Sequence, residues 1–164
     1  MPHSRRRAGA RLSHVDEDGR VRMVDVGGKS ETAREAVARG RITVGAAALR
    51  AIRAGKIKKG DPLQAARLAG ILAAKRTSEL IPLCHQLPLS HVHVEVTREK
   101  GGYSIEARVR TKARTGVEME ALTAVAVAAL TLYDMLKALD KTMVIGEIRV
   151  MEKRGGRSGE YLGA

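Results

Sequence analysis

Cysteine and aromatic residues are scarce in this sequence. Its 164 residues include one cysteine, three tyrosines and no phenylalanine or tryptophan. A single cysteine excludes a disulfide within the chain, which fits a reducing compartment such as the cytoplasm. Because large rings are almost absent, the core is expected to be aliphatic, with alanine and glycine allowing helices and strands to approach closely.

Long apolar segments are absent too. The longest nearly apolar run, residues 121–133, is shorter than the roughly 20 residues that a membrane-spanning helix needs. We therefore expect no membrane span and interpret this run as a buried helix. Residues 1–15 are basic, but no apolar segment follows them, so they lack the pattern of a secretory signal.

Acidic residues are missing from one stretch of a basic chain. The formal net charge is +12, and residues 40–60 hold six Lys and Arg side chains and no acid. This stretch suits a nucleic acid or a phosphorylated small molecule, although a solvated surface loop has the same composition. Lys58 and Lys59 come just before Asp61 and Pro62, which mark a helix start, and a helix N-terminus beside two ammonium groups favours phosphate.

The length suggests one domain with a single core. We predict a flexible basic tail over residues 1–20, one catalytic domain over 21–152 and a flexible, Gly-rich basic segment over 153–164. The predicted elements are a strand over 32–42 (with a helix as the alternative), a helix over 44–54, a helix over 61–80, a loop over 83–90, a hairpin of strands over 91–97 and 105–110, a helix over 117–139 and a strand over 143–151. This order predicts an α+β, ferredoxin-like two-layer fold, an antiparallel sheet with helices packed on one face.

Charged side chains mark both ends of the long predicted helix. Glu118 and Glu120 open it and Asp134 and Lys137 lie near its end. Acids in a first turn can simply complement the helix dipole, and Asp134 with Lys137 can be a plain i, i+3 pair. However, Asp134 directly follows the apolar run, and a charged side chain in such a position normally has an oppositely charged partner or a functional role. Glu118 and Asp134 are about 24 Å apart along one helix, so they serve different sites or a site shared between subunits of an oligomer.

The segment Leu83-Cys84-His85 lies between two prolines, which stiffen the loop and can hold His85 in place. A turn histidine without a role is the alternative. With His91 and His93 nearby, Cys84 and His85 could suggest a zinc site. However, the chain has no second cysteine, and the spacing of these residues is not typical of zinc sites. We therefore predict no metal bound by the protein.

Seven segments, taken in order, match one known family. They are Met23-Val24-Asp25-Val26, Lys59-Gly60-Asp61, Ala74-Lys75-Arg76-Thr77, Leu80-Ile81-Pro82-Leu83-Cys84-His85, Thr115-Gly116-Val117-Glu118-Met119-Glu120-Ala121-Leu122-Thr123-Ala124, Tyr133-Asp134-Met135-Leu136-Lys137-Ala138 and Met143-Val144-Ile145-Gly146. Over about residues 21–160 the chain resembles the molybdenum-cofactor biosynthesis protein C family, the cyclic pyranopterin monophosphate synthases. Gln86 departs from the pattern, because the family often has proline there.

The resemblance implies a lyase and its partners. Its family converts 3′,8-cyclo-7,8-dihydroguanosine 5′-triphosphate to cyclic pyranopterin monophosphate and releases pyrophosphate, an early step of molybdenum cofactor biosynthesis. A radical-SAM GTP cyclase supplies that substrate. The resemblance also implies a homo-oligomer, a hexamer built as a trimer of dimers, with sites shared between subunits. No cofactor is expected, although Mg²⁺ can accompany the triphosphate.

The same resemblance carries over the site residues, with Asp134 matching the acid or base of the family. The implied catalytic residues are Asp134, Lys59, Lys137, His85, Glu118 and Glu120. The implied substrate-binding residues are Leu83, Cys84, His85, Met119, Glu120 and Lys153.

An RNA-binding module of ferredoxin-like topology is the alternative function, since the positive charge supports it. Such modules stack bases on aromatic side chains of the sheet. The predicted hairpin strands carry no aromatic residue, and Tyr103 alone is not a stacking platform. We therefore expect no specific nucleic-acid binding.

Overall fold

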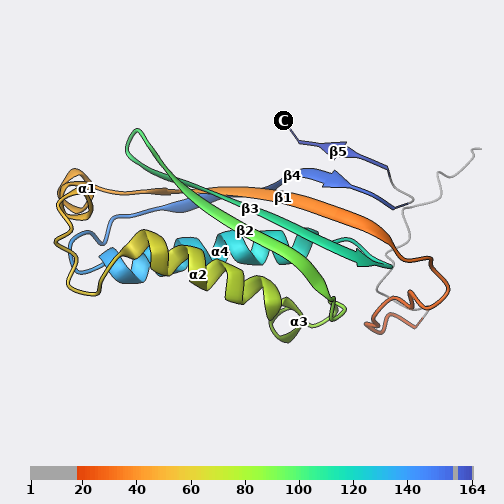
Figure 1. Ribbon diagram of the computed structural model, residues 1–164. Coiled ribbons are helices and arrows are strands. Elements are labelled where there is room, and N and C mark those ends of the chain that lie inside the picture. Colours follow the sequence, from red (N-terminus) through yellow and green to blue (C-terminus); the bar gives the residue numbers. More distant parts are fainter. Residues whose placement is uncertain (1–17, 157–158, 164) are drawn as a thin grey trace, which may run out of the picture.

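An antiparallel sheet with helices on one face forms the frame of the protein (Figure 1). The computed structural model describes residues 18–156 and 159–163. In chain order the elements are β1 (Thr32–Thr43), α1 (Ala46–Arg53), α2 (Pro62–Lys75), α3 (Thr77–Leu80), β2 (Leu89–Glu99), β3 (Gly102–Ala113), α4 (Glu118–Leu136), β4 (Ile145–Arg154) and β5 (Tyr161–Leu162). The predicted tail over residues 1–20 lies almost wholly outside the described residues.

The strand order confirms the ferredoxin-like prediction. The sheet runs β2-β3-β1-β4-β5, and every neighbouring pair is antiparallel. The first four strands have the ferredoxin-like order, and the two-residue strand β5 is added beside β4. Residues 32–42 form the strand β1, which settles the choice left open between strand and helix.

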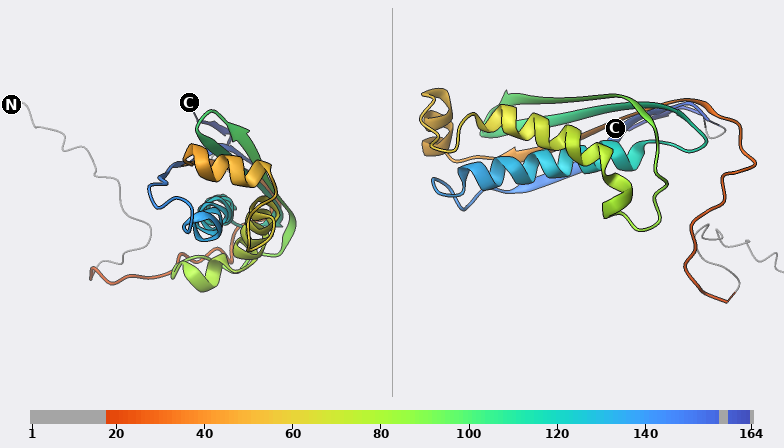
Figure 2. Two further views of the ribbon diagram at one scale, coloured as in Figure 1. Left: turned by 90° about the vertical axis from the view of Figure 1, so that its left-hand side faces the viewer. Right: turned by 60° about the horizontal axis from the view of Figure 1, so that its bottom comes forward.

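The core between sheet and helices is aliphatic, as predicted. Helices α2 and α4 pack side by side against the sheet (Figure 2). Tyr103 is the one aromatic residue among the buried residues of the described chain. Gly70 of α2 allows a close approach, because a Cβ there would lie 2.9 Å from the carbonyl oxygen of Ala124 in α4.

The end of α2 differs from the prediction of one helix to Leu80. The helix ends at Lys75, and α3 forms a separate turn after Arg76, whose φ is −114°. Thr77 is 1% exposed, and its hydroxyl donates to the carbonyl oxygens of Ala73 and Ala74. These bonds satisfy carbonyl groups at the end of α2 and explain why the helix stops there.

The last helix and the last long strand end at other residues than predicted. Helix α4 ends at Leu136, three residues before the predicted end, and β4 continues to Arg154. The predicted boundary between the domain and its C-terminal segment, after residue 152, therefore falls inside β4. Pairing with β1 extends the strand, since Lys153 lies opposite Ala36.

Helix α4 is long and apolar enough to cross a membrane, judged by length and composition. Half of its most apolar stretch is buried inside the domain. The helix packs against α2 and against β1 and β3. It is therefore the central core helix of this fold, as the interpretation of residues 121–133 expected.

Candidate active site

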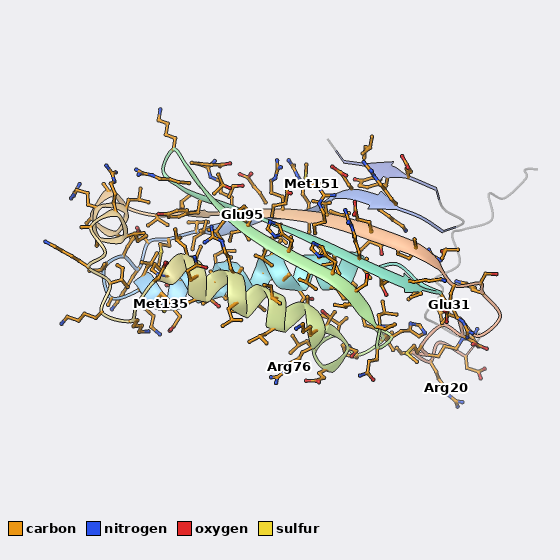
Figure 3. The ribbon with its side chains drawn as sticks, in the orientation of Figure 1. Arg20, Glu31, Arg76, Glu95, Met135 and Met151 are labelled. Carbon is orange, nitrogen blue, oxygen red and sulfur yellow. The ribbon has the colours of Figure 1, made fainter. Side chains whose placement is uncertain are left out.

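The predicted site residues form two groups at opposite ends of α4. Glu118 and Asp134 belong to one unbroken helix, so about 24 Å separates them. In Figure 3, Met135, the residue after Asp134, lies at the left of the molecule, whereas Glu31, which precedes β1, lies at the right. Within one chain, the residues of each group lie close together, but the group around Glu118 and the group around Asp134 do not form one site.

Asp134 binds two ammonium groups at the C-terminal end of α4. Lys59 Nζ lies 2.9 Å from Oδ2, and Lys137 Nζ lies 2.7 Å from Oδ1. The hydrogen bond from Lys137, together with that from Lys59, lowers the pKa of Asp134 to about 2. Asp134 in turn raises the pKa of Lys137. At neutral pH this half-exposed cluster, here called the aspartate cluster, is therefore ionised and carries a net positive charge.

The turn before α2 holds Lys59 beside α4. Gly60 has a φ of 96°, a conformation that favours glycine, and it turns the chain into the helix. Asp61 then caps α2, because its carboxylate accepts from the backbone N–H groups of Leu63 and Gln64. Lys59 Nζ also donates to the backbone carbonyl oxygen of Asp134, at 3.0 Å. The predicted cap and the predicted phosphate-binding lysine are thus parts of one turn.

Glu118 and Lys153 form an ion pair at the opposite end of the helix. Lys153 Nζ lies 2.6 Å from Glu118 Oε1, and each side chain is about a quarter exposed. Lys153 points to the helix side of the sheet because its partner in β1, Ala36, belongs to the core there. The pair therefore joins β4 to the first turn of α4.

Glu120 is the buried carboxyl group of the site, with 4% of its surface exposed. Burial raises the pKa of Glu120, and the neighbouring Glu118 carboxylate adds to the rise. A carboxyl group with a raised pKa can take up or release a proton nearer to neutral pH, as a general acid or base requires.

The predicted substrate-binding loop lines a cavity of about 450 Å³, here called the loop cavity. His85 Nε2 lies 2.8 Å from the carbonyl oxygen of Val24. Since a carbonyl only accepts, Nε2 carries a proton and Nδ1 of a neutral ring is an acceptor. Burial, with the Glu120 carboxylate, raises the pKa of the Cys84 thiol, so this cysteine is not an activated nucleophile. The predicted residues in the loop cavity are Leu83, Cys84, His85, Glu118, Met119 and Glu120.

A second cavity, of about 500 Å³, contains residues that sequence reasoning missed. It shares Lys29 and Glu118 with the loop cavity. Arg34 of β1 and Arg114, which follows β3, also line it. These cations come from separate segments, so no local pattern marks them. The one available signal was the position of Arg114 directly before the matched block that begins at Thr115.

His91 and His93 do not join either cavity. They lie on β2 with their rings stacked, the ring centroids 6.4 Å apart. Cys84 and His85 line the loop cavity instead. Within residues 18–156 and 159–163, no group of three His, Cys, Asp or Glu side chains is arranged to hold a metal ion.

Aromatic side chains form no base-stacking platform on the described part of the sheet. Tyr103 belongs to the core that faces the helices, Tyr133 lies on α4 and Tyr161 on the edge strand β5. The other face carries ion pairs, such as Arg108 with Glu35 at 2.8 Å. The RNA-binding alternative therefore gains no support.

Comparisons with known proteins agree with the resemblance. The sequence model of the MoaC family matches residues 23–156. Two proteins named cyclic pyranopterin monophosphate synthase, from Chloroflexus aggregans and Thermomicrobium roseum, are each 61% identical to this chain, over 152 and 154 residues. The alignments cover 92% of both chains in the first pair and 93% of both in the second. A protein of the same name from Heliobacterium modesticaldum is 58% identical over 92% of this chain and 96% of its own. The chain belongs to the MoaC family.

Proposed function

We propose that this chain is a cyclic pyranopterin monophosphate synthase, a lyase of molybdenum cofactor biosynthesis. The family match carries this proposal, because it spans both ends of α4 and so includes both groups of site residues. The proposed reaction converts 3′,8-cyclo-7,8-dihydroguanosine 5′-triphosphate to cyclic pyranopterin monophosphate and pyrophosphate.

Rebuilding a purine into a pterin requires proton transfers at ring atoms. The loop cavity offers two groups for this task, the Glu120 carboxyl group with its raised pKa and Nδ1 of His85. Glu118 is held by Lys153, so its carboxylate has a fixed position at the cavity wall. We assign proton transfer to Glu120 and His85 and positioning of the substrate to Glu118.

Closing the cyclic phosphate is the second chemical task. A sugar hydroxyl attacks the α-phosphorus, the bond from that phosphorus to the α–β bridging oxygen breaks, and the bridging oxygen leaves with pyrophosphate. The hydroxyl proton needs a base, and negative charge on the phosphates needs cations. Asp134, with a pKa of about 2, stays ionised and suits an electrostatic partner, not a group that exchanges a proton near neutral pH. Lys59 and Lys137 suit the stabilisation of negative charge.

The complete site in this proposal forms between two subunits. A small substrate cannot contact Glu120 and Asp134 of one chain, because the length of α4 separates them. The outer side of the helices also exposes leucines to solvent: Leu68, Leu72 and Leu130 are 59%, 48% and 58% exposed. Exposed apolar side chains of this kind are typical of surfaces covered by another chain. A hexamer, a trimer of dimers, is the assembly that the resemblance implies.

The remaining parts of the proposal concern the setting of the reaction. A radical-SAM GTP cyclase supplies the substrate, and the enzyme acts in the cytoplasm. Mg²⁺ enters with the triphosphate and not through a protein cage. No cofactor takes part.

A turnover assay tests the function directly. The purified protein is incubated with 3′,8-cyclo-7,8-dihydroguanosine 5′-triphosphate, and pyrophosphate release is followed together with pterin fluorescence after oxidation. Equal amounts of pyrophosphate and pterin are expected. Folded, assembled protein that gives neither product would overturn the proposal.

A further inference from the structure

Residues 23–29, here called the strap, cover one side of the loop cavity without belonging to the sheet. They precede β1 and form neither a helix nor a strand. In Figure 1 this part of the chain leaves the sheet at the start of β1 and turns toward the loop between α3 and β2. Val24 and Val26 are half-buried and line the cavity, whereas Met23 and Asp25 are exposed. The side chains thus alternate between cavity and solvent, as in an extended chain that lies across an opening.

Few hydrogen bonds hold the strap in place. In the part of the chain that the structure describes, His85 is the one side chain outside the strap that hydrogen-bonds to it, at 2.8 Å from the carbonyl oxygen of Val24. Two further bonds lie within the strap: the Gly27 N–H donates to the Asp25 carboxylate, and the Lys29 N–H donates to the carbonyl oxygen of Val26. Strand β1, by contrast, pairs with a strand on each side. A segment held by so few bonds opens at a lower free energy than the sheet does.

The bond between His85 and the strap also determines which ring nitrogen can accept a proton. Nε2 is the donor to the Val24 carbonyl oxygen, so Nδ1 of the neutral ring is the acceptor. Without that carbonyl oxygen Nε2 loses its partner, and either nitrogen of the neutral ring can carry the proton. The position of the strap therefore controls the tautomer of His85.

We propose that the strap is a movable lid, that His85 latches it closed, and that the closed lid holds His85 in the tautomer whose Nδ1 is an acceptor. Val24 is then a positioning residue, because its carbonyl oxygen acts through His85. Opening of the lid gives a substrate access to the loop cavity, and closing places the apolar side chains of Val24 and Val26 over it and excludes water. The identity of the substrate rests on the proposed function, whereas the movement and the latch rest on the contacts of the strap.

Limited proteolysis of the assembled protein without ligand tests the latch. Trypsin cuts after Arg22, directly before the strap, and after Lys29 at its end, and the rate of cutting follows the population of the open lid. His85→Ala removes the donor and is expected to speed cleavage at both sites about three- to tenfold, because one hydrogen bond is lost. His85→Gln keeps an N–H donor and should be cut at nearly the wild-type rate. His91→Ala is the matched control, since the His91 ring stacks on His93 outside the cavity.

Nitrogen-15 NMR of histidine-labelled protein at pH 8 reads the tautomer of His85. The wild type is expected to carry the proton on Nε2. Asp25→Ala loosens the strap without changing a residue that lines the loop cavity, because only the bond to the Gly27 N–H is lost. In this variant trypsin cleavage should be faster and the form with the proton on Nδ1 should appear, at an unchanged melting temperature. Ser90→Ala, which removes a bond to the Arg110 carbonyl oxygen at the edge of the sheet, is the control.

Two results without ligand would overturn the inference: equal cleavage rates in wild type and His85→Ala, or an unchanged His85 tautomer in an Asp25→Ala protein that is cut faster. Excess 3′,8-cyclo-7,8-dihydroguanosine 5′-triphosphate then separates the lid from the proposed function, and it is expected to slow cleavage after Lys29 about tenfold. Active wild type whose cleavage is unchanged by this compound would overturn the lid alone. Wild type that shows the expected latch but neither turnover nor protection would overturn the function and support the latch.

Discussion

Asp134 and Glu120 are carboxyl groups of one helix in opposite surroundings. Asp134 is half exposed between two ammonium groups, which lower its pKa. Glu120 is buried near another carboxylate, and its pKa is raised. Carboxyl groups whose pKa values are pushed apart in this way can divide the roles of fixed charge and proton exchange. Each role can be tested on the single residue.

Asp134 is expected to stay ionised down to strongly acidic pH. Because its folded pKa is about 2, below the unfolded value, it stabilises the folded state above pH 4. That contribution is lost as the pH falls from about 4 to about 2. Carbon-13 NMR of the labelled carboxyl group should show a midpoint near 2 and no titration between pH 5 and 8. A midpoint near 4 would show that the aspartate cluster does not form in solution.

Asp134→Asn removes the charge while keeping the shape of the side chain. In the assembled, folded protein, turnover is expected to fall about a hundredfold or more, since a fixed negative charge is lost. Near-normal turnover would exclude a catalytic role for Asp134. Thermal unfolding and the oligomer mass, measured in parallel, show whether the variant keeps its fold and assembly.

Glu120→Gln is expected to separate activity from stability. Since burial raises the pKa of Glu120, its ionisation destabilises the folded state once the pH rises above the pKa that Glu120 has in the unfolded chain. The Gln variant is never ionised, so its melting temperature relative to wild type should increase between pH 5 and pH 8. Activity should fall by about a hundredfold, because proton exchange is lost. Glu79→Gln, at an exposed position of α3, is the control and should change neither property.

At the scale of elements, helix starts were easier to predict than helix ends. Asp61 and Pro62 form a local signal, and α2 begins there as predicted. The end of α2 was missed because it depends on Thr77, whose burial is a property of the packed protein. The extension of β4 through Lys153 likewise depends on pairing with β1, which a Gly-rich, basic sequence does not reveal.

Gly70→Ala tests the close contact of α2 with α4. Alanine favours a helix over glycine by about 1 kcal/mol, so an exposed site would gain stability. Here the added Cβ would lie 2.9 Å from the carbonyl oxygen of Ala124, and overpacking of this kind costs about 1 to 3 kcal/mol. We therefore expect a net loss of up to about 2 kcal/mol in the free energy of unfolding, measured by denaturant titration. Gln64→Ala, at an exposed position of α2, is the control, and a more stable Gly70→Ala would contradict the packing described.

At the scale of the whole molecule, the sequence predicts a distance along one helix but not which distant segments of the chain come into contact. The distance between Glu118 and Asp134 could be predicted, because the rise of a helix is constant. The cavity of about 500 Å³ could not be predicted, because its lining residues Lys29, Arg34 and Arg114 meet only through the pairing of β1 with β3 and the path of the chain before β1. Because the two ends of α4 are so far apart, one chain can supply only one of them to a site, and a second subunit must supply the other.

Mixing two inactive variants tests whether subunits share a site. Glu118→Gln inactivates one end of α4 and Asp134→Asn the other, so a shared site in a mixed assembly can combine two intact ends. After exchange of equal amounts of both variants, about a quarter of the sites should be intact, and activity should rise accordingly. Lys59→Gln mixed with Asp134→Asn is the matched control, because both changes fall in the aspartate cluster of one chain and no mixture restores it. Verified subunit exchange without any rescue in the first mixture would show that each chain completes its own site, and the two ends of α4 would then need separate functions.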